Sequence, residues 1–194
     1  MQQKQKVALF GSLRAMTMTA MLTAMSVVIG IFCKNFLNFG AGPYAGLFRI
    51  TFENLPILAA GLMFGPIVGG MAGLSADIIS YLLSRQVYPI NPLVTLGAMS
   101  VGLVSGLVSH YLIKRPGKLR IVLACATAHV VGSMIIKPFG LFQFYGWAVL
   151  WRIPLYLAIA PTEILLLCLI YRNKTVRLLI DGHGGKRHEH RTSH

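Results

Sequence analysis

The chain has 194 residues, of which 55% are hydrophobic and only 12% are charged, and its mean hydropathy is +0.67. A soluble domain carries about a quarter of its residues as charged types, so the composition excludes an ordinary soluble protein and favours one polytopic membrane domain. The 18 Lys and Arg residues outnumber five acids and give a net charge of +13. These basic residues flank apolar runs, as membrane topology requires, so we expect no nucleic-acid partner.

Motifs for catalysis or metal binding are missing from the sequence. The three cysteines lie in or beside apolar runs without metal or redox spacing. There is no Gly-rich phosphate loop followed by Lys and Ser or Thr, no His-Glu-x-x-His and no Gly-x-Ser-x-Gly. We therefore expect no enzyme activity, catalytic residue, cofactor or metal, and interpret the histidines after residue 182 as part of a solvated tail.

Apolar runs in chain order predict an all-α integral membrane protein, a bundle of six transmembrane helices. Runs of about 18 residues approach the length that crosses a bilayer. We expect a cytoplasmic segment at 1–14, the membrane domain at 15–172, and a basic, His-containing cytoplasmic tail without regular structure at 173–194. The expected spans are residues 15–32, 47–64, 67–84, 93–113, 121–136 and 147–171, and the connections include 34–46, 85–92 and 137–146.

The basic residues predict the orientation in the cell membrane. With six spans both termini lie on one side, and thirteen of the 18 Lys and Arg residues fall on that side. Positive charge marks the cytoplasm, so we expect both termini inside. The remaining five fall on the outer side or in the spans: Lys34, Arg49, Arg85, Lys137 and Arg152.

The second span opens with Arg49 and Glu53, four residues apart. On a helix this spacing places both side chains on one face. Ionisable groups at the mouth of an apolar segment are costly and indicate a functional site. A structural ion pair that reaches the membrane interface is the alternative interpretation.

Aromatic and amide residues lie between the outer basic residues. Such a mixture suits a flat aromatic ligand that bears negative groups, because rings stack and Arg or Lys bind carboxylates. The alternative is an aromatic belt at the outer interface with cations beside it. The set includes Tyr88, Phe139, Gln143, Trp147 and Trp151.

The sequence RITFENLPILAAGLMFGP (49–66), followed by GGMAGLSADIISYLL (69–83), resembles the substrate-binding subunits, or S components, of energy-coupling factor (ECF) vitamin transporters. Ala20 and Ala24 in the first span, and Gly73 four residues before Asp77, add to the resemblance. RITFENLP and the stretch from WRIP (151–154) to APTE (160–163) are most similar to the folate-specific member.

The resemblance implies a six-helix bundle that binds one vitamin from outside with high affinity and has no ATPase of its own. It implies docking, through Ala20 and Ala24, on a transmembrane coupling subunit joined to two ATPases. The loops at 34–46, 85–92 and 137–146 would cap the ligand.

For folate, the resemblance and the chemistry of the side chains suggest roles for particular residues. Glu53 or Asn54 would bind the pterin's donor edge, with Asp77 behind them. The other expected substrate-binding residues are the cations Lys34, Arg49, Lys137 and Arg152, the amide Gln143, and the aromatic residues Tyr88, Phe139 and Trp147. Alternatives are another vitamin (riboflavin, pantothenate or thiamine), a membrane adaptor without ligand, a membrane enzyme, or a solitary secondary transporter.

Overall fold

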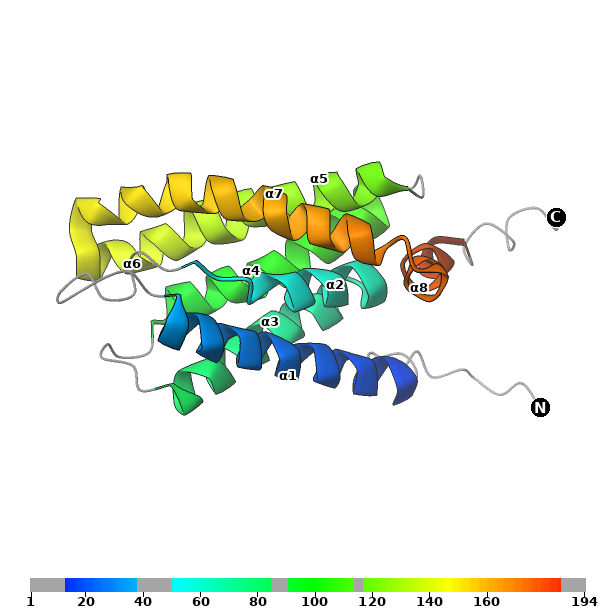
Figure 1. Ribbon diagram of the computed structural model, residues 1–194, viewed down its shortest axis with the longest axis horizontal. Helices are drawn as coiled ribbons and strands as arrows, with labels where there is room; N and C mark the ends of the chain where they lie inside the picture. The colour runs from blue at the N-terminus through cyan, green and yellow to red at the C-terminus, as the bar shows by residue number, and fades with distance from the viewer. Residues whose placement is uncertain (1–12, 38–49, 85–90, 114–116, 186–194) are drawn as a thin grey trace, which may run out of the picture.

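The computed structural model describes residues 13–37, 50–84, 91–113 and 117–185. Within these ranges all regular structure is helical, and no strand forms (Figure 1). The elements are α1 (Leu13–Phe36), α2 (Asn54–Phe64), α3 (Pro66–Leu83), α4 (Pro92–Leu107), the π-helix η2 (Val108–Leu112), α5 (Lys118–Ala128), the π-helix η3 (His129–Ile136), α6 (Lys137–Tyr145), the 3-10 helix η4 (Gly146–Trp151), α7 (Arg152–Ile170) and α8 (Lys174–Gly185).

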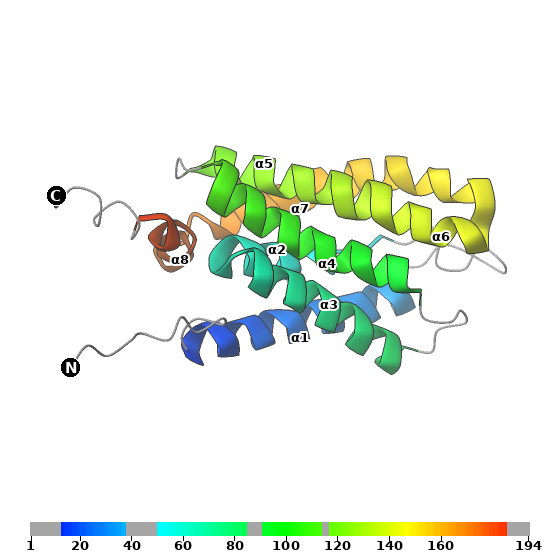
Figure 2. The ribbon, with the colours of Figure 1, turned by 180° about the vertical axis from the view of Figure 1, so that it is seen from behind.

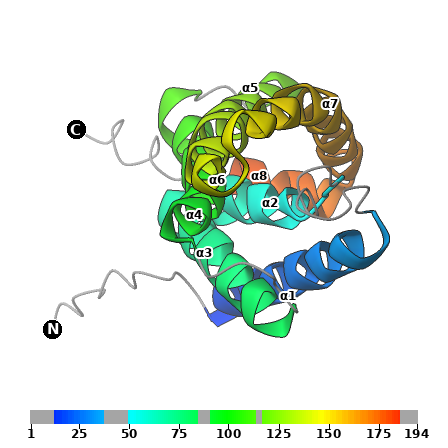
Figure 3. The same ribbon diagram turned by 90° about the vertical axis from the view of Figure 1, so that its left-hand side faces the viewer.

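The long helices run along a common axis (Figures 1 and 2). Helices α5, η3 and α6 form one continuous rod, which turns back at η4 into α7. Figure 3, viewed along the bundle, shows α2 in the middle, between α1 on one side and the α5–α7 hairpin on the other. Helix α8 lies across the end of the bundle where α1 begins (Figure 1).

Four apolar helical segments in the described ranges are long enough to cross a membrane: Ala15–Phe36, Pro66–Leu83, Pro92–Leu112 and Lys118–Ile170. The last contains 53 residues and folds back on itself at η4. Helix α2 has only 11 residues, about 16 Å at 1.5 Å per residue, and is shorter than a full crossing. Many large apolar side chains of the long helices are exposed, as lipid-facing side chains are.

Glycines allow α2, α3 and α4 to pack closely. A Cβ atom added at Gly69 would lie 2.5 Å from the Gly102 carbonyl oxygen, and one added at Gly61 would collide with Ser105. Backbones that approach this closely gain van der Waals contact, which drives helix association in membranes. Gly65, with φ +97°, forms the turn between α2 and α3, and Pro66 begins α3 in the first turn, where its missing N–H is not needed.

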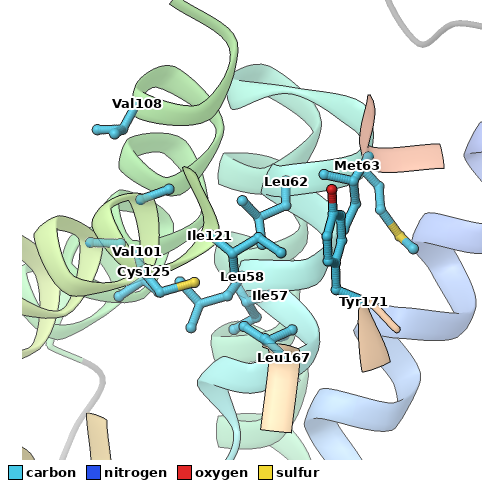
Figure 4. Close-up of a cluster of buried hydrophobic side chains, with 14 of the residues drawn as sticks. Ile57, Leu58, Leu62, Met63, Val101, Val108, Ile121, Cys125, Leu167 and Tyr171 are labelled. Atoms are coloured by element: carbon cyan, nitrogen blue, oxygen red, sulfur yellow. The ribbon is translucent and has the colours of Figure 1, made fainter. Parts of the chain in front are cut away.

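The apolar core lies around α2 (Figure 4). Leu58 and Leu62 of α2 are fully buried against residues of α4 and α5 such as Val101 and Ile121. Ile180 of α8 joins this core and is 3% exposed. Helix α8 therefore closes the core at the end where the short helix α2 stops.

The structure differs from three sequence expectations. The second helix begins at Asn54 rather than near residue 47, and residues 50–52 are not helical. Arg49, which was expected to share a helix face with Glu53, lies outside the described residues. The segment expected to be a loop at 137–146 is mostly helix α6, because Pro138 occupies the first turn, where proline is tolerated, and Gly140 packs against α4.

The tail is also more ordered than expected. Residues 174–185 form α8, because Val176, Leu179 and Ile180 share one helix face that packs on the core. Two prolines of the last expected span lie in α7, Pro154 in its first turn and Pro161 inside it.

Candidate ligand-binding site

A small cavity brings together four of the polar residues that the sequence singled out, Glu53, Asn54, Asp77 and Lys137. Its volume is about 10 Å³, enough for one water molecule. Vitamin-sized ligands occupy pockets of roughly 300 Å³ or more, so such a ligand requires this cavity to widen. The lining residues come from α1, α2, α3, α4, α6 and the residue before α2: Ser26, Glu53, Asn54, Ile57, Ala76, Asp77, Ser80, Ala98 and Lys137.

Lys137 connects the start of α6 to the start of α2. Its Nζ donates to Asn54 Oδ1 at 3.2 Å and lies 3.7 Å from Glu53 Oε1. Lys137 and Asn54 are buried, and the Glu53 side chain is 15% exposed. A buried ammonium group is stable only beside such partners, which identifies these three residues as a structural and electrostatic unit.

The side-chain amide of Asn54 has an unused hydrogen-bond donor, its Nδ2 group. Its oxygen accepts from Lys137, and its Nδ2 makes no hydrogen bond to any residue in the described part of the chain. Asn54 is fully buried and lines the cavity. An unused buried donor costs roughly 1–3 kcal/mol, so it favours a binding partner with an acceptor.

The backbone around Glu53 is fixed from two sides. Ser26 Oγ donates to the Glu53 carbonyl oxygen at 2.6 Å, and the Glu53 N–H donates to Thr51 Oγ1 at 3.3 Å. A Cβ atom added at Gly30 would lie 2.9 Å from Glu53 Oε2, so the glycine lets α1 approach the carboxylate. The position of Glu53 therefore depends on α1 as well as on α2.

A second carboxylate and a second ammonium group belong to the same region. Thr95 Oγ1 of α4 donates to Asp77 Oδ2 of α3 at 2.7 Å. Lys34, near the end of α1, donates to Ser80 Oγ at 2.7 Å and to Ser84 Oγ at 3.3 Å. With Lys137 and Glu53, the site holds two ammonium groups and two carboxylates, whose formal charges balance.

Lys34 and the remaining described residues expected to bind substrate do not line the cavity. Arg152 is buried beside Tyr156, with its terminal nitrogen donating to the Tyr156 hydroxyl at 3.1 Å and its guanidinium 5.5 Å from the ring centroid. Phe139, Gln143 and Trp147 are exposed on α6 and η4, and the Trp147 and Phe142 rings form a T-shaped pair. Tyr88 and Arg49 lie outside the described residues.

The residues expected to dock on the coupling subunit lie on the surface of the bundle. Ala20 and Ala24 are both exposed, one turn apart on α1. Their exposure leaves a face with small side chains on which another helix can approach.

Sequence reasoning missed several buried polar groups. It did not select Ser26, Ser80 or Thr95, because hydroxyl residues are common in membrane helices and carry no distinctive spacing. It also assigned no role to His129 and Glu163, whose Nε2 and Oε2 atoms lie 2.8 Å apart. Their one sequence signal is that ionisable residues inside an apolar run are costly.

These features define a class of protein: a helical membrane bundle that holds a polar, charge-balanced site among its helices. The comparisons give the family. Residues 14–180 match the family model of the ECF transporter substrate-specific component, and the chain belongs to this family. Members of this family are substrate-binding components of transporters rather than enzymes.

Two solved structures are similar to this fold. The crystal structure of FolT bound with folic acid aligns with a TM-score of 0.62 and 22% identity, covering 79% of this chain and 90% of that chain. A structure of the S component of a bacterial ECF transporter aligns with a TM-score of 0.60 and 23% identity, covering 82% of this chain and 94% of that one.

A curated relative gives no function. Over 66 residues, 34% of this chain, the sequence is 33% identical to an uncharacterized protein (MG098 homolog) of Mycoplasma pneumoniae. The matched segment spans 13% of that protein's length.

Proposed function

We propose that this protein is the high-affinity substrate-binding membrane subunit of an ECF-type ABC transporter that imports folate. The observation that carries the proposal is the buried Lys137–Asn54–Glu53 unit at the cavity, which leaves the Asn54 amide with an unused donor. Membership of the family and the structural similarity to FolT bound with folic acid support it.

The chemistry of the cavity suits a pterin. That ring carries an edge of adjacent donors and acceptors, which an amide donor and carboxylate acceptors can bind together. Asn54 Nδ2 would donate to the ring oxygen, and Glu53 or Asp77 would accept from its N–H groups. Lys34, Lys137 and Arg152, with Arg49, would provide positive charge for the glutamate tail.

Stacking residues complete the proposed site. Phe139 and Trp147 are exposed on α6 and η4, and Gln143 is exposed between them. We propose that these side chains, with Tyr88, close over the ligand as the cavity widens, since aromatic rings gain energy by stacking on a flat ligand.

We also propose six membrane crossings with both termini in the cytoplasm. The start of α1 and α8 lie at the same end of the bundle (Figure 1), as an even number of crossings requires. Thirteen of the 18 basic residues belong to that side of the predicted topology. On the same basis, residues 1–14 and 173–194 are cytoplasmic.

Transport requires partners that this chain does not contain. We propose that it docks on a transmembrane coupling subunit with two ATPase subunits, and that Ala20 and Ala24 form part of the docking surface. The exposure of both alanines on one face of α1 supports this assignment.

Calorimetric titration of the purified, detergent-solubilised chain with folic acid, a reduced folate and riboflavin tests the proposal. We expect one-to-one binding of a folate without any ATPase present. Glu53→Gln should weaken that binding at least tenfold, whereas Thr162→Ala, an exposed position on α7, should leave it unchanged. Binding of riboflavin alone would keep the family and exclude folate; binding of none of the three would contradict the proposal.

A further inference from the structure

The end of the bundle where α1 begins is covered by α8, which has two different faces. Val176, Leu179 and Ile180 pack on the core. Lys174 and Leu178, one turn apart, lie on the opposite face and are exposed, and Leu178 is 71% exposed. The helix axis runs across the bundle axis (Figures 1 and 3), as expected for a helix that lies parallel to a membrane surface.

Basic residues gather at this end, on what we call the α8 basic surface. Lys118 begins α5, Arg172 follows α7, and Lys174 and Arg177 belong to α8; all four are exposed. Of the acidic residues in the described ranges, Glu53, Asp77 and Glu163 lie inside the bundle or toward its other end, and Asp181 belongs to α8, so four basic residues at this end outnumber one acid. The surface therefore has a concentrated positive charge in the described residues.

The basic surface begins where the apolar outer surface ends. Leu169 and Ile170 of α7 are exposed, and Arg172 follows within two residues. Leu119, which is 69% exposed, stands next to Lys118. Exposed apolar side chains directly beside basic ones are expected where the lipid tails end and the headgroups begin.

We propose that the α8 basic surface binds the headgroups of anionic phospholipids, and that these lipids hold α8 against the end of the bundle. The positive charge is complementary to phosphate, and Lys and Arg at the boundary are within reach of it. Because Ile180 belongs to the core, a lipid that holds α8 in place also stabilises the packing around α2.

The test is titration of the full, detergent-solubilised chain with phosphatidylglycerol or phosphatidylcholine, followed by native mass spectrometry. The wild-type chain should bind phosphatidylglycerol at least tenfold more tightly than phosphatidylcholine. Each Lys or Arg near the surface contributes about fivefold to the affinity for an anionic lipid. We therefore expect the preference for phosphatidylglycerol to fall at least tenfold in the triple variant Lys118→Gln, Arg172→Gln and Lys174→Gln. The charge-preserving set Lys118→Arg, Arg172→Lys and Lys174→Arg should retain it.

Two further measurements distinguish headgroup binding from a general effect of anions and from a loss of folding. Phosphatidylglycerol should raise the melting temperature of the wild type more than that of the neutralised variant, and inorganic phosphate should not reproduce the rise. The neutralised variant should bind folic acid as the wild type does, because no changed residue lines the cavity. An unchanged lipid preference after neutralisation, or an equal rise in melting temperature with inorganic phosphate, would overturn the proposal whatever the outcome for folate.

Discussion

His129 Nε2 on η3 lies 2.8 Å from Glu163 Oε2 on α7, and the two side chains are 1% and 0% exposed. The contact is close, and no hydrogen bond connects either side chain to another residue in the described part of the chain. The pair is therefore a direct contact between a ring nitrogen and a carboxylate oxygen. It joins the α5–η3–α6 rod to α7 in the interior of the bundle.

Removing one member of this pair should destabilise the fold. Glu163→Ala leaves His129 buried without its carboxylate, and breaking a buried pair costs about 3–5 kcal/mol. We expect a marked fall in the melting temperature in detergent and a lower midpoint in an SDS unfolding titration. Thr162→Ala, at an exposed neighbour, should change the free energy of unfolding by about 0.5 kcal/mol or less. Equal stability of the two variants would show that the His129–Glu163 contact contributes nothing.

Lys137→Met tests the polar unit at the cavity. The change leaves Glu53 without the ammonium group 3.7 Å away and leaves Asn54 Oδ1 without its donor. We expect at least tenfold weaker folate binding by calorimetry and a loss of about 1–3 kcal/mol of stability. Combining Lys137→Met with Glu53→Gln should recover part of the stability, because both charges are then removed together. Strictly additive losses in stability would indicate that the two residues do not interact.

Gly97→Ala should disturb the same site without changing any charge. The added Cβ would lie 2.5 Å from Lys137 Cγ and 3.2 Å from the Gly132 carbonyl oxygen, so the lysine must move. We expect folate affinity to fall at least tenfold in the calorimetric titration. Gly70→Ala is the matched control, because its nearest neighbour, Leu103 Cβ, is 3.4 Å away. Similar affinities of the two variants would mean that the position of Lys137 does not affect binding.

The role of Asp77 can be tested through Thr95, which donates to it at 2.7 Å. Thr95→Val removes the donor and keeps the shape, whereas Thr95→Ser keeps the hydroxyl. A hydrogen bond to a charged group contributes about 1.5–3 kcal/mol, so we expect Thr95→Val to lower the melting temperature and Thr95→Ser to restore most of it. Folate titration of both variants would then show whether the orientation of Asp77 affects the ligand. A melting temperature that Thr95→Val leaves unchanged would exclude a stabilising bond.

Much of the architecture follows from the sequence. Long apolar runs predict membrane helices because each helix satisfies its own backbone hydrogen bonds in lipid. Local signals were less reliable where tertiary packing acts. The segment 137–146 was expected to be a loop, but most of it forms α6, where Gly140 packs against α4. The tail at 174–185 is polar in composition, yet three apolar residues on one face are sufficient for α8 to pack on the core.

The sequence by itself determined the class of protein and its apolar helices, and it selected Glu53 and Asn54 as site candidates. It could do so because hydropathy and local residue types act over one helix at a time. Only the tertiary structure decided which polar groups meet. Lys137 bonds to Asn54 across 83 residues, and Thr95 reaches Asp77 from another helix. Such contacts depend on how each helix is rotated and how closely glycines let the backbones approach. Those quantities are set by the packing of all the helices together and not by any single segment.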